Sequence, residues 1–165
     1  MLLEEGNKNR TSGYRVLDTK LKTVFSNNIR NNFGFLNRTE DCNSDSPDKL
    51  FIQEGRKVFK QVVPMVSKLL EEHLKENNIH IDKVNRLWLH QANLNMNLSI
   101  AKKLLQREPN KEEMPIVLNE YANTSSAGSI IAFHKYKEDL KKGDIGVICS
   151  FGAGYSVGSV IVQKI

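Results

Sequence analysis

Hydrophobic side chains recur along this chain with two different periods, one typical of helices and one typical of strands. Between Leu50 and Asn77 the apolar residues fall three or four positions apart, which predicts a long amphipathic helix. Asp48 or Ser46 can cap its start. Pro64 lies inside the same run and should kink or divide the helix, because its ring removes one backbone donor.

Two shorter helices follow with the same period. Asn93 can cap a helix over 94–106, and another runs from the polar turn at 119–126 to about Leu140, with Gly143 as its expected stop. Between the helices, short apolar runs predict strands. One or two strands are expected at 13–25, and single strands at 84–90, 115–118, 145–150 and 157–163.

The order of these elements is βαβαβαββ, which predicts an α/β fold. Strands that alternate with helices favour a mostly parallel or mixed sheet covered by helices, here with five strands, and the last two strands should be antiparallel neighbours. The stretch 26–50 is rich in Asn, Asp and Ser and predicts a long loop. We therefore divide the chain into 1–50, with the first strand and this loop, and a domain over 51–165.

Composition narrows the class of protein. A chain of 165 residues with 39% hydrophobic and 26% charged residues fits one soluble globular domain. No apolar run reaches the roughly 18 residues of a membrane span. Two cysteines make neither a disulfide framework nor a zinc-binding pattern, so we expect a reducing cytoplasm and no metal. The net charge of +5 is spread thinly and suits an acidic partner or a phosphate-bearing ligand, with nucleic acid the weakest alternative.

Three polar or glycine-rich clusters follow predicted strands: LHQAN at 89–93, YANTSSAG at 121–128 and FGAGYSVG at 151–158. Ligand sites of open α/β sheets lie beyond the carboxyl ends of strands, so the first two should meet at one rim. Each cluster also has a structural explanation: His90 as a packed histidine, Asn123 as a helix cap, and the glycines as part of a hairpin. Together they suit stabilising an oxyanion on a thioester or enolate.

Four segments resemble the C-terminal half of β-ketoacyl-acyl-carrier-protein synthase III. They are FIQEGRKVFK at 51–60, HQANLNMNLSIAKKLL at 90–105, NTSSAGSIIAF at 123–133 and GDIGVICSFGAGYSVGSVIV at 143–162. The resemblance implies the thiolase fold, in which two similar βαβαβαββ halves pack together. On this basis the opening MLLEE is expected to be the tail of the preceding half, and the chain one thiolase-like half.

The resemblance also implies the chemistry of individual residues. His90 and Asn123 match the family's catalytic His and Asn, which donate hydrogen bonds to the malonyl thioester as decarboxylation forms an enolate. A catalytic Cys in the other half takes an acyl group from a thioester, and the carbanion attacks it in a Claisen condensation. Gly152, Ala153 and Gly154 match the glycine-rich turn of the acyl-enzyme oxyanion hole, with Ala153 in place of the middle glycine and a stiffer loop expected.

Partners follow from the same resemblance. It implies an acidic acyl carrier protein, acyl-CoA and malonyl-carrier-protein substrates, no further cofactor, and a cytoplasmic homodimer without membrane or nucleic-acid binding. Lys102 and Lys103 match basic positions that dock the carrier protein, whereas Asn95 stands where the family often has Arg. The two lysines equally suit an ordinary solvated helix face.

Neither cysteine of the chain fits the role of the nucleophile. Cys42 lies in an acidic loop that would raise its pKa, and Cys149 is expected to be a buried structural residue. His73, His80 and His134 are expected on the surface or in packing. The sequence therefore predicts the C-terminal catalytic domain of an acyltransferase, inactive by itself. The alternative is a non-catalytic partner subunit or a carrier-protein-binding module.

Overall fold

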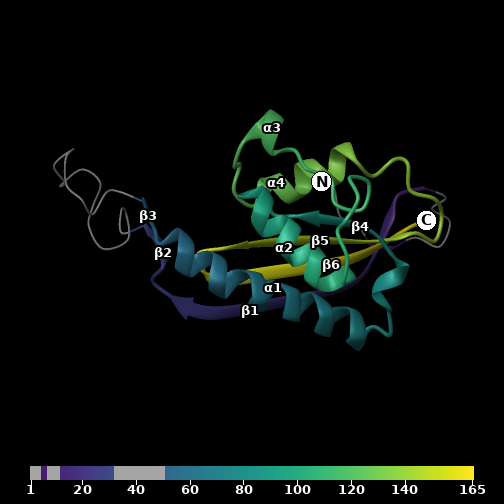
Figure 1. Cartoon of the computed structure of the whole chain (residues 1–165). Coiled ribbons are helices and arrows are strands. Elements are labelled where there is room, and N and C mark those ends of the chain that lie inside the picture. Colours follow the sequence, from purple (N-terminus) through teal and green to yellow (C-terminus); the bar gives the residue numbers. More distant parts are fainter. Residues whose placement is uncertain (1–4, 7–11, 32–50) are drawn as a thin grey trace.

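The computed structural model describes residues 5–6, 12–31 and 51–165 (Figure 1). A twisted sheet lies between two layers of helix. The long helices α1 (Gly55–Glu76) and α2 (Leu94–Leu105) cover one face, and the short helices α3 (Leu118–Tyr121) and α4 (Ala127–Lys135) lie on the other side. The predicted α/β class with a helix-covered sheet is confirmed.

The sheet is mixed and has the strand order β1-β6-β5-β4. Strand β4 (Val84–Leu89) runs parallel to β5 (Ile145–Gly152), which forms an antiparallel pair with β6 (Gly154–Lys164). The edge strand β1 (Tyr14–Ser26) pairs antiparallel with β6 and carries two register shifts. The last two strands are therefore the expected antiparallel neighbours, and the region 13–25 forms one long strand.

The sheet has four strands among the described residues, and the predicted fifth strand at 115–118 is wrong. This segment does lie beside the edge strand β4, because the Leu87 N–H donates to the Glu113 carbonyl at 2.7 Å. Pro115 then brings a residue with no N–H, so a backbone ladder cannot continue. The segment passes directly into α3, which lies inside the predicted polar turn.

Helix α1 begins later than predicted and runs unbroken across Pro64. Pro64 lies on the solvent side of the helix, where water can satisfy the carbonyl that loses its helical hydrogen bond. Phe51, predicted to be helical, belongs instead to the short strand β3 (Phe51–Gln53), which pairs with β2 (Ile29–Asn31) near the start of the predicted loop. The expected caps Ser46 and Asp48, and most of the loop, lie outside the described residues.

The core between α1, α2 and the sheet follows the predicted apolar period. Val66, Leu69 and Ile100 are fully buried, and they pack with residues of β4, β5 and β6 into one cluster. Burying each such side chain contributes about 1.5–3 kcal/mol of hydrophobic free energy. The 3₁₀ turn η2 (Ile81–Lys83) connects α1 to β4. Burial of these apolar side chains therefore holds α1 and α2 against the sheet.

A second cluster, centred on Trp88 of β4, fills the space beneath α4. The fully buried indole meets the ring of Phe133 edge-on, with ring centroids 4.9 Å apart, and that of Tyr14 at 6.2 Å. Gly146 on β5 makes room for it, because a Cβ there would lie 2.1 Å from Trp88 Cζ3. The indole Nε1 donates to the Tyr136 carbonyl at 3.1 Å.

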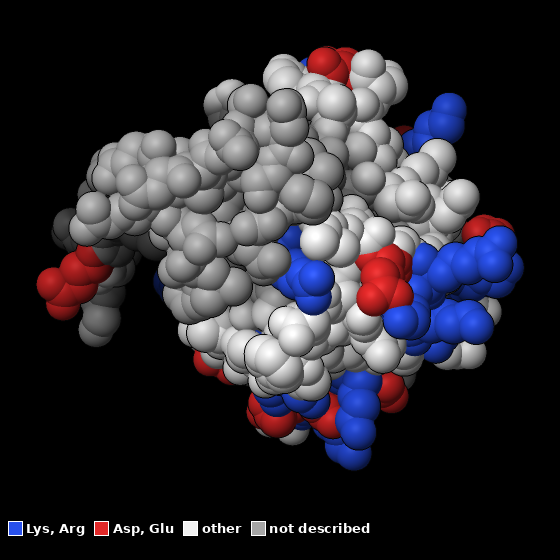
Figure 2. Space-filling view, turned by 90° about the vertical axis from the view of Figure 1, so that its left-hand side faces the viewer, with Lys and Arg blue, Asp and Glu red and all other residues white. Residues whose placement is uncertain are grey.

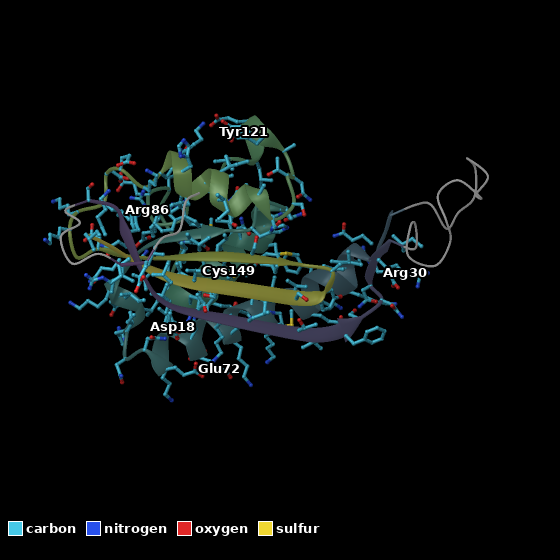
Figure 3. All side chains as sticks on the ribbon, turned by 180° about the vertical axis from the view of Figure 1, so that it is seen from behind. Asp18, Arg30, Glu72, Arg86, Tyr121 and Cys149 are labelled. Carbon is cyan, nitrogen blue, oxygen red and sulfur yellow. The ribbon has the colours of Figure 1, made fainter. Side chains whose placement is uncertain are left out.

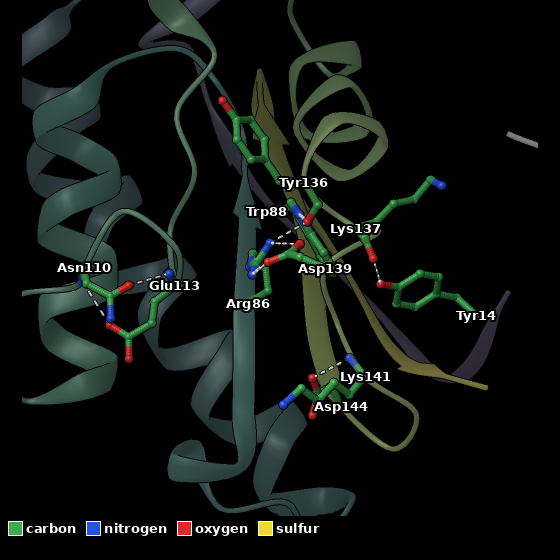
Figure 4. Close-up of polar contacts among 10 residues, drawn as sticks. All are labelled: Tyr14, Arg86, Trp88, Asn110, Glu113, Tyr136, Lys137, Asp139, Lys141 and Asp144. Carbon is green, nitrogen blue, oxygen red and sulfur yellow. Dashed lines mark hydrogen bonds and ion pairs between the residues drawn. The ribbon is translucent and has the colours of Figure 1, made fainter. Parts of the chain in front are cut away.

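The predicted helix end at Leu140 is wrong, since α4 ends at Lys135. The chain beyond it is held against β4 by Arg86, which is buried and makes two hydrogen bonds to Asp139, at 3.0 and 2.6 Å (Figure 4). These bonds hold the pKa of Asp139 below its usual range. Gly143 does not stop a helix. Its φ of +94° forms the turn into β5 instead.

His73, on the inner side of α1, joins three elements of the fold. It is fully buried, with Nδ1 2.9 Å from the Ser159 hydroxyl of β6 and Nε2 3.3 Å from the Asp18 carboxylate of β1. Asn77 donates to the same Asp18 oxygen at 2.8 Å. Burial lowers the pKa of His73, and the charge of Asp18 offsets this in part. The histidine is a packing residue, as expected.

The free energy of unfolding is expected to fall as the pH drops below about 6.5, because the unfolded chain binds a proton at His73 more readily than the fold does. The stabilisation is present above the unfolded pKa and is lost in acid. Urea unfolding at about pH 7.5 and about pH 5.5 measures this slope. His73→Gln should reduce this slope, and the part that remains belongs to His90, whose pKa is also lowered by burial. An unaltered slope in His73→Gln would contradict the assignment.

Candidate active site

His90 follows the carboxyl end of β4 and is almost entirely buried, at 7% exposed. Its ring packs against that of Phe151 on β5, with centroids 4.8 Å apart. Burial lowers the pKa of His90, so the imidazole is neutral at neutral pH. Nδ1 has no hydrogen-bond partner among the described residues. The site therefore holds a neutral, pre-oriented imidazole with one nitrogen able to donate.

Gln91, the next residue, connects β4 to residues 115–117 through its side chain, where a fifth strand would have made backbone hydrogen bonds. Its Nε2 donates to the Leu89 carbonyl at 2.9 Å, and its Oε1 accepts from the Val117 N–H at 3.0 Å. The amide side chain thus joins β4 to the segment that leads into α3. Gln91 was not among the predicted site residues, although its position as a polar residue soon after an apolar strand was an available signal. Asn93 caps α2 as predicted, accepting from the Met96 N–H at 3.1 Å.

Asn123 lies in the exposed loop between α3 and α4. Its Oδ1 accepts from the Ser125 N–H at 2.9 Å, which leaves the Nδ2 group to donate elsewhere. This orientation is maintained by Ala122 and Ser125, whose φ values of 53° and 57° turn the backbone sharply. Asn123 is therefore a loop residue, and the interpretation as a cap of α4 is wrong, because its side-chain oxygen bonds within the loop.

The loop of Asn123 is packed onto the end of β4 at Gly128. A Cβ on Gly128 would lie 2.7 Å from Cβ of Gln91 and 3.2 Å from the Thr124 hydroxyl. Only a glycine lets the start of α4 approach Gln91 this closely. His90 and Asn123 share no hydrogen bond in the described part of the chain, so the structure joins their segments through Gln91 and Gly128.

Three serines connect the same loop to β5. The Ser126 carbonyl accepts from the Ser129 hydroxyl at 3.2 Å and from the Ser150 hydroxyl at 3.3 Å, and the two hydroxyls lie 3.2 Å apart. Ser150 stands two residues before Gly152, so this cluster links the Asn123 loop to the glycine-rich turn. This cluster could not be predicted from the sequence, because Ser126 and Ser150 are brought together only by the packing of α4 on the sheet.

The glycine-rich turn connects β5 to β6 as the predicted hairpin. Gly152 pairs with Ser156, and the exposed Ala153 lies at the tip. Gly154 has a φ of +132°, and a Cβ there would lie 2.8 Å from both the backbone nitrogen and the hydroxyl of Ser156. A glycine is therefore required at 154, whereas a Cβ at 152 would meet nothing within 4 Å.

The remaining candidates lie away from this rim. Cys149 is fully buried within the sheet (Figure 3), and burial raises its pKa to about 12, so it is structural, as predicted. Cys42 lies outside the described residues. Lys102 and Lys103 are exposed on the last turn of α2, where Lys102 forms an ion pair with Glu108. Within residues 12–31 and 51–165, no group of His, Cys, Asp and Glu is arranged to hold a metal ion.

The architecture is that of the thiolase-like condensing enzymes. Two solved structures of 3-oxoacyl-[acyl-carrier-protein] synthase III share the fold. The enzyme from Aquifex aeolicus superposes with a TM-score of 0.76 and 22% identity, over 95% of this chain and 46% of its own. The enzyme from Pseudomonas aeruginosa superposes with a TM-score of 0.75 and 22% identity, over 96% of this chain and 46% of its own.

Sequence comparison gives the family. Residues 74–164 match the family described as 3-oxoacyl-[acyl-carrier-protein (ACP)] synthase III C terminal. The chain is 60% identical over 151 residues to the β-ketodecanoyl-[acyl-carrier-protein] synthase of Pseudomonas aeruginosa, covering 92% of this chain and 43% of that protein. It is 32% identical to the β-ketoacyl-[acyl-carrier-protein] synthase III of Blochmanniella pennsylvanica, over 74% of this chain and 39% of that protein. The chain belongs to this synthase III family and spans less than half the length of these relatives.

Proposed function

We propose that this chain is the C-terminal catalytic half of a β-ketoacyl-acyl-carrier-protein synthase, an acyltransferase that performs a decarboxylating Claisen condensation. The observation that carries the proposal is His90: a buried, neutral imidazole at the end of β4 with an unpartnered ring nitrogen. The ring packs against Phe151, but its Nδ1 atom gains nothing from that contact, and an unsatisfied buried polar atom is costly to keep. It suits a site where charge appears on a bound carbonyl.

In this proposal His90 and Asn123 hold the thioester carbonyl of the malonyl substrate. Neutral donors stabilise the enolate oxygen that forms when carbon dioxide leaves, without binding the ground state too tightly. Asn123 keeps its Nδ2 group for this purpose because its oxygen is occupied by Ser125. Backbone N–H groups of the turn Gly152–Ala153–Gly154 would face the acyl-enzyme carbonyl. Acyl-CoA and malonyl-carrier-protein are then substrates, and the chemistry needs no further cofactor.

The nucleophile would come from the N-terminal half of the fold. Cys149 is excluded by its burial and raised pKa. The sheet face on the α4 side offers a surface for the missing half. Leu21 of β1 lies opposite Gly158 of β6 and is 77% exposed, and Phe25 near the end of the same strand is 85% exposed. Exposed apolar groups of this size favour a covered surface in the complete enzyme.

An acyl carrier protein is the proposed macromolecular partner. Figure 2 shows Lys and Arg side chains gathered toward one side of the face in view, with Asp and Glu side chains beside them. Lys102 and Lys103 of α2 are exposed and are the candidates for docking an acidic carrier. We also propose that the complete enzyme is a cytoplasmic homodimer. No helix in the described ranges has the length and hydrophobicity to cross a membrane.

The test is reconstitution. Joined to, or mixed with, the cysteine-bearing half, this chain should release carbon dioxide from malonyl-carrier-protein and form a β-ketoacyl product, and neither half should do so alone. Mass spectrometry of the carrier protein follows the product. Condensation that proceeds without this chain would overturn the proposal. Tight binding to the cysteine half without condensation would instead favour the alternative of a non-catalytic partner subunit.

A further inference from the structure

A closed ring of hydrogen bonds lies directly behind the glycine-rich turn. Asn28 Nδ2 donates to Gln61 Oε1 at 2.8 Å and to the Tyr155 hydroxyl at 3.0 Å, and that hydroxyl donates to Gln61 Oε1 at 3.0 Å. The donors and acceptors are consistent throughout: the amide nitrogen gives two hydrogens, the oxygen accepts two, and the hydroxyl does one of each. Such a ring restricts all three side chains to one arrangement.

The ring connects three elements that are far apart in the sequence. Tyr155 belongs to β6 and directly follows Gly154, Gln61 lies on α1, and Asn28 lies between β1 and β2. Tyr155 itself is only 2% exposed, so its ring is packed in the core while its hydroxyl reaches polar partners. The turn is thus held from the α1 side by a single hydroxyl group.

The same region is anchored a second time through the end of β1. Ser26 pairs with Gly154 across the sheet, and its hydroxyl accepts from the Asn28 N–H at 3.2 Å. The Asn28 carbonyl accepts from the Glu54 N–H at 2.9 Å, just before α1 begins. Both the N–H and the carbonyl of Asn28 are therefore hydrogen-bonded. Because its backbone is fixed independently of Tyr155, the Asn28 side chain can hold the Tyr155 hydroxyl in position.

We infer that Tyr155, Gln61 and Asn28 are positioning residues that set the backbone of the turn Gly152–Ala153–Gly154 for acyl transfer. This inference rests on the proposed function. This role does not require any of the three side chains to contact substrate. Their effect is on where the backbone N–H groups of the turn point, and a small displacement of such donors lowers the rate of the step that they assist.

The test uses Tyr155→Phe in the complete enzyme, a change that removes one oxygen and retains the packed ring. Acylation of the catalytic cysteine should slow by about tenfold or more, while malonyl decarboxylation, assigned to His90 and Asn123, should change by less than about twofold. Burst kinetics with acyl-CoA measures the first step, and carbon dioxide release measures the second. Tyr14→Phe is the matched control, because it also removes a hydrogen-bonded hydroxyl, at the opposite end of β1.

Gln61 gives an independent check on the exposed side of the ring. Gln61→Glu keeps an oxygen that accepts both bonds and should acylate at close to the normal rate, whereas Gln61→Leu should reproduce the defect of Tyr155→Phe. Parallel losses of acylation and decarboxylation, in proportion to a lower melting temperature, would show a purely structural role and overturn the inference.

A readout without catalysis separates this inference from the proposed function. In the chain by itself, Tyr155→Phe should speed amide hydrogen exchange at residues 152–155, and Tyr14→Phe should not. If the complete enzyme proves inactive but exchange responds as expected, the proposed function fails and the positioning role stands. Unchanged exchange in Tyr155→Phe would overturn the positioning role.

Discussion

His90→Ala and Asn123→Ala, each placed in the complete enzyme, are expected to abolish decarboxylation of the malonyl thioester while leaving acylation of the cysteine largely intact. Each change removes a donor aimed at developing negative charge, and losing one such donor typically costs about a hundredfold to a thousandfold in rate. Carbon dioxide release and intact-protein mass of the acyl-enzyme measure the two steps separately.

The environment of each residue sharpens this expectation. His90 is buried against Phe151, so its truncation leaves a cavity as well as a missing donor, and thermal unfolding must accompany the assay. Asn123 is exposed, so its truncation should barely change stability. His134→Ala, at an exposed position of α4, is the control for histidine removal. Normal decarboxylation in both His90→Ala and Asn123→Ala would refute the assigned roles.

Gly146→Ala should cause the largest loss of stability among single methyl additions. The new Cβ would stand 2.1 Å from Cζ3 of Trp88, whose ring is fully buried and enclosed by Phe133 and Tyr14. Neither the indole nor the strand has free space to move into, so overpacking should cost about 1–3 kcal/mol or more. Urea unfolding of the chain measures the loss.

Two further variants identify the cause of that loss. Gly55→Ala adds the same methyl group where nothing lies within 4 Å, and it should leave stability nearly unchanged. Trp88→Leu combined with Gly146→Ala should lose less than the two single changes added together, because the smaller side chain relieves the clash. Strict additivity would mean that the contact between Gly146 and Trp88 is not the source of the instability.

Most elements of this fold could be predicted because their residues follow a local period. Strands β4, β5 and β6 and helices α1 and α2 each present an apolar face that one sheet or helix can bury, and Asn93 caps α2 through a neighbouring N–H. The failures share a cause as well. Residues 115–118 have a strand-like composition, but Pro115 and the side chain of Gln91 decide how that segment meets β4.

The residues of the candidate site also fall into some that the sequence predicts and some that it does not. His90, Asn123 and the turn at 152–154 were expected because each follows an apolar run, and the resemblance to the synthase III family supplied their roles. Gln91 and Ser150 were missed, since their partners lie far away along the chain. The hydrophobic periodicity of a sequence does not identify side chains that connect two segments far apart along the chain.

The sequence by itself determined the α/β class, the burial of the long helices and the family to which the chain belongs, because these depend on residue types at short spacings. The tertiary structure alone decided that the sheet has four strands among the described residues, that Asn123 lies in a loop where its oxygen accepts from the Ser125 N–H, and that the Tyr155 hydroxyl bonds Gln61 of α1. Hydrogen bonds and close packing between distant segments depend on distances of a few tenths of an ångström, which the fold sets and no local pattern records.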